Sequence, residues 1–314
     1  MHYITIPALE IGTASSGNFG HAGRKGSRGG SVSKRAASGA PSEGALRSLG
    51  LLPEDARELS SALTFSSPYG QAILKKYNTT PAEINGKIEA ARVEVAGMQS
   101  TASLHTDANG NYTAERAELH RRIADELYEK AVSDTPPVFL LTGGRPGSGK
   151  STMLHNDTEF SERAKGLVVD SDVIKQRLAE HDGLQKLGTR ASAYHEESDA
   201  VTTILMERAV SERKSLVYDA TMKSTGKTLA IVREAKRAGY RIEVGFMNTS
   251  ITDSVLGAVD RFLGPKSGRF VDPIYIASHD HKNEVTFEAI KNEADSWKEY
   301  RRTSAGSVML VSKG

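Results

Sequence analysis

The chain has 314 residues, no cysteine and a formal net charge of +2 from 41 basic and 39 acidic side chains. The absence of cysteine excludes disulfides and thiolate chemistry, and the balanced charge gives no overall argument for nucleic acid or membrane as a partner. No apolar run approaches the ~20 residues of a membrane helix, and the N-terminus lacks a secretory signal pattern. These features predict a cytoplasmic protein with no membrane contact.

Residues 1–45 are rich in Gly and Ser and basic. They contain too little apolar surface to offset the entropy of ordering the chain, so a disordered basic tail is predicted. One interpretation is electrostatic contact with nucleic acid or a virion surface. The alternative is a solvated linker. The basic residues are Arg24, Lys25, Arg28, Lys34 and Arg35.

Residues 46–107 carry helix signals. Pro53 marks one helix start, and Thr80 followed by Pro81 and Glu83 marks another. Three short helices are predicted up to about residue 100. Their apolar side chains are too few for a separate core, so we expect this region to pack on the next one or to be partly ordered. The polar stretch "STASLHTDANGNYT" then predicts a break.

Residues 108–314 alternate between helix and strand patterns. A helix carrying Leu119, Ile123 and Leu127 on one face comes first. Apolar strands follow in "VFLL", "GLVVDSD", "SLVYDAT" and "YRIEVGFMN", with helices between them. This order implies right-handed crossovers and a parallel sheet covered by helices on both faces, an α/β fold of the P-loop kinase type. Ligands are then expected at the carboxyl ends of the strands.

The segment "GGRPGSGKST" directly follows the first predicted strand. Its spacing, glycine, four residues, then Gly-Lys-Ser, is that of a phosphate-binding loop. Glycines let backbone N–H groups face phosphate oxygens, the lysine adds positive charge, and the Ser151 hydroxyl can bind Mg²⁺. ATP and Mg²⁺ are the predicted cofactors. The predicted contacts are Gly144, Pro146, Gly147, Ser148, Gly149, Lys150, Ser151 and Thr152.

Motifs that other classes of phosphate-loop protein carry after the loop are missing from this sequence. Neither the DxxG turn nor the NKxD motif of Ras-type GTPases occurs there. The next strands end in Asp-Ser-Asp and Asp-Ala-Thr instead of the Asp-Glu usual in motor ATPases and helicases. A kinase is therefore the preferred class.

A kinase needs a carboxylate to take the proton of the acceptor hydroxyl. Asp170 and Asp172 have the same parity along an extended chain, so both would face the cleft if the strand persists that far. We favour Asp172 as the base, because it lies further past the strand and Lys175 follows one helical turn later. Asp170 is interpreted as a contact near Mg²⁺ or substrate. For either residue the alternative is a helix N-cap.

Further charged residues are expected around the transferred phosphate. Asp219 ends the next strand and Thr221 follows it, so this pair would hold substrate hydroxyls or complete the metal shell, with turn capping as the alternative. Arg261 is expected on a helix that ends near Gly264, and Arg269 falls in a Gly/Pro-rich segment that suggests a mobile lid. Both would neutralise transition-state charge. Lys266 is interpreted as a solvated residue.

Residues 112 to about 300 resemble the zeta toxin kinases. The shared pieces, in order, are "YTAERAELHRRI", "GGRPGSGKST", "VVDSDVIK", "YHEES", "VYDAT", "DRF" and "VDPIYIASHDH". The resemblance implies transfer of the γ-phosphate of ATP to a nucleotide sugar such as UDP-N-acetylglucosamine. It implies Lys150 and Ser151 as phosphate and Mg²⁺ contacts, Asp172 as base, and Arg261 and Arg269 as charge clamps.

The resemblance also suggests roles for less certain residues. Glu196 or Glu197 would face the sugar pocket, against the alternative of two solvated acids in the first turn of a helix. Asp219 stands where some members have the longer Glu. His279 and His281 have no third metal ligand at a recognisable spacing and are interpreted as lid or surface residues.

Partners and alternative functions stay open. A small helical antitoxin holds free zeta kinases, so an antitoxin, or inhibition in cis by residues 46–100 obstructing the nucleotide site, is one hypothesis. A docking module is the other. The alternative functions are a polynucleotide 5′-hydroxyl kinase and a virion-associated nucleotide-binding protein without turnover.

Overall fold

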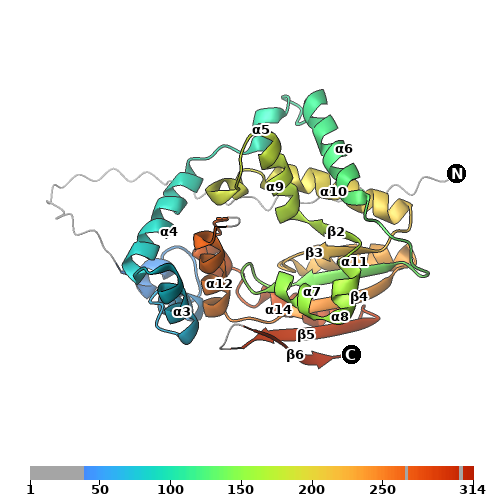
Figure 1. The fold of residues 1–314 in the computed structure, drawn as a ribbon. Coiled ribbons are helices and arrows are strands. Elements are labelled where there is room, and N and C mark those ends of the chain that lie inside the picture. The colour runs from blue at the N-terminus through green and yellow to red at the C-terminus, as the bar shows by residue number, and fades with distance from the viewer. Residues whose placement is uncertain (1–38, 266–267, 304–306) are drawn as a thin grey trace.

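The computed structural model describes residues 39–265, 268–303 and 307–314. Most of the predicted basic tail, and Lys266, lie outside the described residues. A six-stranded sheet with the strand order β2-β3-β1-β4-β5-β6 forms the centre of the fold (Figure 1). β1 to β5 are parallel and β6 is antiparallel to β5. The strands are β1 (Val138–Gly143), β2 (Leu167–Asp170), β3 (Leu216–Asp219), β4 (Arg241–Met247), β5 (Ser296–Arg302) and β6 (Val308–Lys313).

Helices cover both faces of this sheet, which confirms the predicted α/β fold. Successive side chains of a strand point to opposite faces. Accordingly, Phe139 and Leu141 of β1 join one apolar core with the helices α6, α9, α10, α11 and α14, while Leu140 joins a second core with α7 and α8. The helices are α6 (Ala114–Tyr128), α7 (Lys150–Asn156), α8 (Thr158–Arg163), α9 (Ser171–His181), α10 (His195–Ser211), α11 (Thr225–Arg237), α12 (Ile251–Leu263), α13 (Pro273–Ala277) and α14 (Lys282–Lys291), with a 3₁₀ turn at Gly188–Ser192.

The strand register aligns residues at or next to the carboxyl ends of three neighbouring strands. Thr142 of β1 is opposite Asp219 of β3, and Asp219 is opposite Asp170 of β2. The Thr142 hydroxyl donates a 2.6 Å hydrogen bond to Asp219 Oδ1. The parallel pairing therefore brings two carboxylates from distant parts of the sequence to one edge of the sheet.

The N-terminal region contains five helices where three were predicted, and α5 lies inside the predicted polar break. Prolines begin α2, α3 and α4, and the Thr80–Glu83 capping box is present. These helices share an apolar core with α12 and α13, and none of its described residues comes from a strand. Figure 1 shows α12 between the N-terminal helices and the sheet. The helices are α1 (Glu43–Arg47), α2 (Pro53–Ala62), α3 (Pro68–Tyr77), α4 (Pro81–Ala96) and α5 (Thr101–His105).

β5 and β6 were not predicted from the sequence. The segment of β5, "SWKEYRR", is mostly charged, and Tyr300 is its one buried side chain. The strand forms because it pairs with β4 on one side and β6 on the other. Its existence depends on tertiary pairing and not on an apolar run.

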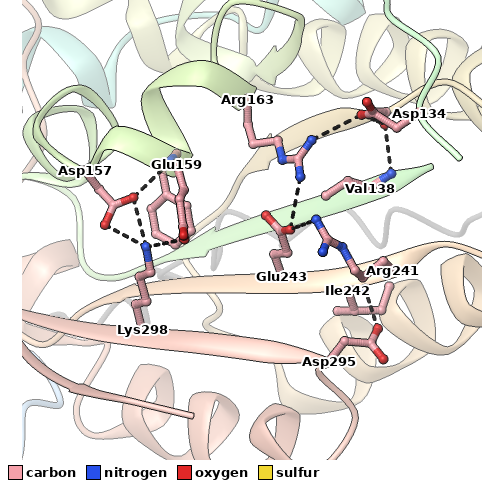
Figure 2. A network of polar contacts seen from close by, with 12 residues as sticks. Asp134, Val138, Asp157, Glu159, Arg163, Arg241, Ile242, Glu243, Asp295 and Lys298 are labelled. Carbon is pink, nitrogen blue, oxygen red and sulfur yellow. Dashed lines mark hydrogen bonds and ion pairs between the residues drawn. The ribbon is translucent and has the colours of Figure 1, made fainter. Parts of the chain in front are cut away.

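A network of ion pairs joins α8 to the strands β4 and β5 (Figure 2). Arg163 of α8 lies 3.2 Å from Asp134 and 3.3 Å from Glu243 of β4. Lys298 of β5 contacts Asp157 at 2.9 Å and Glu159 at 2.6 Å. These ion pairs hold α8, the second helix after the phosphate loop, against the sheet. In the described part of the chain, no helix is long and apolar enough to cross a membrane.

Candidate active site

A cavity of about 690 Å³ lies where β2 and β3 end, beside the loop after β1. Its lining brings together most of the residues that the sequence analysis selected. Gly144, Ser148 and Glu197 are the predicted residues that do not line it. Those that do are Pro146, Gly147, Gly149, Lys150, Ser151, Thr152, Asp170, Asp172, Asp219, Thr221, Arg261 and Arg269.

The loop after β1 has a backbone that only glycine adopts readily. Gly144, Gly147 and Gly149 have φ values of 136°, 80° and 106°. A Cβ atom at Gly147 would lie 2.1 Å from the Ser254 carbonyl oxygen of α12, so the loop packs directly on that helix. Lys150 Nζ lies 3.3 Å from the Gly144 carbonyl oxygen and therefore folds back over the loop.

Asp170 ends β2 and caps α9, because its carboxylate accepts a 2.8 Å hydrogen bond from the Asp172 N–H. Burial, followed by the nearby Asp219 carboxylate, raises the pKa of Asp170 to about 6. Lys150 lowers it by a smaller amount and lies 4.0 Å from Asp219. The cavity thus holds two carboxylates that repel each other next to a single lysine of the loop.

Asp172 reaches the cavity by a different route from the one predicted. The strand ends at Asp170 and does not persist to Asp172, so Asp172 projects into the cavity from the first turn of α9 and not from an extended chain. Its carboxylate is paired with Arg269 and lies 3.8 Å from Arg261 and 3.9 Å from Lys175. Three cations from three separate segments therefore surround one carboxylate.

The cations around Asp172 differ in exposure, since the side chains of Lys175 and Arg269 are largely buried whereas that of Arg261 is partly exposed. Burial is the main cause that lowers the pKa of Arg261, and it lowers the pKa of Arg269 to about 10. Both guanidinium groups stay charged at neutral pH, while burial strengthens their attraction for an anion in the cavity. Burial also lowers the pKa of Lys175.

Glu197 is not a cavity residue, and the expectation that it faces a sugar pocket was wrong. It is fully buried between α6 and α10, where it is bonded to Arg116 and to His120. Burial acts to raise its pKa, but hydrogen bonds from His120 and Arg116 outweigh this and lower it to about 2. Glu196 is exposed and accepts a 2.9 Å bond from Ser100. The alternative of two solvated acids therefore holds for Glu196 alone.

His279 is a second correction. It is fully buried rather than a lid or surface residue, and its Nδ1 lies 2.9 Å from the Tyr275 carbonyl oxygen. Burial lowers its pKa to about 3, so the ring is neutral. His281, by contrast, is exposed. Among the described residues there is no group of three or more His, Cys, Asp or Glu side chains that could hold a metal ion on its own.

Several cavity residues were missed by the sequence analysis. α10 contributes His195, Asp199 and Thr202, which recur at helical spacing and so share one face. That spacing is a signal that could have found them once Asp172 had located the cavity. Lys223 and Lys227 follow β3, and Arg302 ends the unpredicted strand β5, so its position could not be inferred.

Comparison with known proteins places the chain in a family. Residues 123–306 match the family model described as Zeta toxin. The chain belongs to the zeta toxin family. The resemblance stated from the sequence is thereby confirmed, and the family match covers the phosphate loop and the carboxylates but excludes the helices α1 to α5.

Curated members of the zeta toxin family are similar over part of their length. Toxin zeta of Enterococcus hirae is 28% identical over 152 residues, which cover 46% of this chain and 52% of that protein. Toxin zeta of Streptococcus pyogenes is 28% identical over 160 residues, covering 48% and 54%. The chain thus spans about half the length of the curated relatives it matches.

Solved structures show a similar fold. A chain of the AvrRxo1-ORF1:AvrRxo1-ORF2 complex with sulphate ions has a TM-score of 0.56 at 15% identity, covering 69% of this chain and 77% of that one. The AvrRxo1-ORF1:-ORF2 complex with ATP matches with a TM-score of 0.56 at 15% identity over 69% and 76%. At this identity the likeness concerns the fold alone.

Proposed function

We propose that the protein is an ATP-dependent kinase that phosphorylates a hydroxyl group of a small molecule, with a nucleotide sugar such as UDP-N-acetylglucosamine as the preferred acceptor. The observation that carries the proposal is the Asp172 carboxylate, held among Arg261, Arg269 and Lys175 in the same cavity as Lys150. A phosphoryl transferase needs such a base beside a cluster of cations. Membership of the zeta toxin family and the ATP named for a protein of similar fold support it.

The proposed reaction assigns each group a task. Asp172 accepts the proton of the acceptor hydroxyl, whose oxygen forms a bond to the γ-phosphorus while the bond to the bridging oxygen breaks and ADP leaves. Lys150 and the loop N–H groups hold the phosphates of ATP. Arg261 and Arg269 neutralise the charge that spreads over the transferred group. An incoming phosphate would compete with Asp172 for the two guanidinium groups.

A magnesium ion fits the residues of the cavity. Asp219 raises the pKa of the buried Asp170, and a divalent cation between them and the phosphates would relieve this repulsion. Mg²⁺ characteristically uses one or two carboxylates and phosphate oxygens. Ser151, Asp170 and Asp219 would hold it, and when bound it would neutralise phosphate charge.

The remainder of the cavity suits an acceptor with hydroxyl and phosphate groups. Asp199 and Thr202 of α10 offer hydrogen bonds to hydroxyls, as does Thr221 after β3. Lys223 and Lys227 add positive charge that would attract a diphosphate. This combination of groups supports a nucleotide sugar.

Purified protein with Mg²⁺ and γ-labelled ATP is expected to transfer label to UDP-N-acetylglucosamine or another nucleotide sugar. A 5′-hydroxyl oligonucleotide, tested in parallel, is expected to stay unlabelled, and label on it would favour a polynucleotide kinase instead. Label on none of these acceptors, with ATP bound, would favour a nucleotide-binding protein without turnover.

We propose in addition that activity is toxic and that an antitoxin controls it, because the curated relatives are toxins. Induced expression is expected to stop growth of a bacterial host, while expression of Asp172→Asn at the same level does not. Equal growth inhibition by both proteins would contradict a catalytic cause.

Substitution of Gly147 by Ala is expected to weaken ATP binding by at least tenfold, a change of about 1.4 kcal/mol or more. The new Cβ would overlap the Ser254 carbonyl oxygen at 2.1 Å, at a φ of 80° that Ala adopts with strain. Titration calorimetry measures the affinity. Gly86→Ala on α4 is the control, since a Cβ there has no neighbour within 4 Å. Wild-type affinity in Gly147→Ala would show that the loop accommodates the methyl group by moving.

A further inference from the structure

Helix α3, which lies outside the family match, presents one face to the catalytic half of the molecule. Tyr69, Lys76 and Tyr77 all make contacts with residues more than 180 positions away. Their spacing, seven and then one residue, places them on the same side of a helix. The opposite side of α3 is exposed at Lys75.

The first contact of this face involves a cation of the cavity. The Arg302 guanidinium lies over the Tyr69 ring, with its Cζ 5.2 Å from the ring centroid. Arg302 lines the cavity beside the loop, because Cβ atoms at Gly149 and Gly257 would lie 3.0 Å and 3.1 Å from its terminal nitrogens. Its buried Nε has no hydrogen-bond partner among the described residues.

The second contact is with α12 at the turn that carries Arg261. The Tyr77 hydroxyl donates to the Asp260 backbone oxygen and Oδ1, each at 2.9 Å. Lys76 Nζ lies 2.7 Å from the same carboxylate. Asp260 immediately precedes Arg261, so these bonds hold the backbone from which the arginine projects.

The N-terminal helices stand beside the cavity and do not fill it. None of the described residues of α1 to α5 lines it. α2 adds a support at the other end of α12, where Glu58 accepts a 2.9 Å bond from the Thr252 N–H. The apolar core shared by α2, α3, α4 and α12 ties these helices into one packed body.

We propose that α3 is a positioning helix of the nucleotide site. Tyr69 stacks on Arg302 and orients it as a nucleotide contact at the Gly149 end of the loop, while Lys76 and Tyr77 fix the end of α12 for Arg261. The proposal rests on the proposed nucleotide-binding function. It gives α3, which lies outside the family match, a part in nucleotide binding. Tyr69, Lys76 and Tyr77 act through the arginines and touch no nucleotide themselves.

The test measures ATP affinity of the full chain by titration calorimetry in the presence of Mg²⁺. Tyr69→Leu, which keeps an apolar side chain but removes the ring, is expected to weaken ATP binding about fivefold. Arg302→Ala is expected to weaken it about tenfold or more. The double variant is expected to be no weaker than Arg302→Ala alone, because the tyrosine acts only through the arginine.

Two further variants separate positioning from a general loss of structure. Tyr69→Phe keeps the ring over Arg302 and removes the hydroxyl that also interacts with this arginine, so it is expected to bind ATP more tightly than Tyr69→Leu. Lys75→Leu places the same residue type on the exposed side of α3 and is expected to bind ATP normally. In Tyr69→Leu the KM for the acceptor is expected to stay unchanged. A general loss of structure would instead raise both this KM and the Kd for ATP.

Wild-type ATP affinity in Tyr69→Leu would overturn the proposal, and so would a double variant whose loss equals the product of the two single losses. Either outcome leaves the proposed kinase function standing. Failure of the wild-type protein to bind ATP overturns the proposed function and, with it, this role for α3.

Discussion

Asp172→Asn is expected to lower kcat about 10²–10⁴-fold with little change in ATP affinity, because it removes the group that accepts the proton and keeps the size of the side chain. The carboxylate lies beside Arg261, Arg269 and Lys175, which in the variant lose their shared anion. Single-turnover transfer to the acceptor measures the chemical step, and calorimetry measures ATP binding.

Glu207→Gln is the matched control for this experiment. Glu207 is an exposed acid on α10, so its conversion to the amide is expected to leave both quantities unchanged. A kcat for Asp172→Asn within tenfold of wild type would contradict its role as the base. If Asp219→Asn or Asp170→Asn then showed the larger loss, the proton would go to one of these neighbouring acids.

Glu197→Gln is expected to destabilise the protein by about 3 kcal/mol, the lower end of the cost of breaking a buried ion pair, because Arg116 keeps a second carboxylate partner. Glu197 is fully buried, and Arg116 has a second partner in Asp182, which lies 2.6 Å away. The free energy of unfolding from urea titration is the measurement. Glu196→Gln is the control, since Glu196 is exposed and accepts its hydrogen bond from Ser100 at the surface. Equal stability of the two variants would contradict a structural role for Glu197.

The same ion cluster predicts a pH dependence of stability. The pKa of Glu197 is lowered in the folded protein from its ordinary 4.5 to about 2. The folded state therefore binds fewer protons than the unfolded state between these values, and the contribution of Glu197 is full above pH 4.5 and is lost as the pH falls toward 2. Acid unfolding of Glu197→Gln is expected to lack this part of the pH dependence, whereas Glu196→Gln retains it.

The residues whose position at the cavity was expected from the sequence follow from local signals. The phosphate loop is a continuous segment. Its glycines Gly144, Gly147 and Gly149 occupy positions with positive φ, a conformation that glycine adopts readily. Asp170 and Asp219 end apolar strands, and parallel pairing brings such ends together. Asp172 was found for a partly wrong reason, since a helix turn carries it to the cavity instead of an extended strand.

The residues that were missed or misplaced depend on long-range packing. Glu197 and His279 look like surface residues in sequence, yet both are fully buried. Glu197 contacts His120 of α6, and His279, which follows α13, lies against the backbone oxygen of Tyr275 in that helix. A charged residue gives no sign of burial until its partner is placed, and the partner of Glu197 lies 81 positions away in Arg116.

The amino-acid sequence by itself determined the α/β class, the phosphate loop and the acids at the strand ends, because these depend on apolar runs, glycine conformation and chain order. Only the tertiary structure decided which charges meet: Asp172 with Arg269, Glu197 with Arg116, and Arg302 with the ring of Tyr69. The physical reason is that an ion pair or a stacked ring requires proximity between segments that no local pattern encodes. The contacts of α3 with Arg302 and Asp260 also depend on the tertiary structure, since helix signals show that α3 forms but not what it touches.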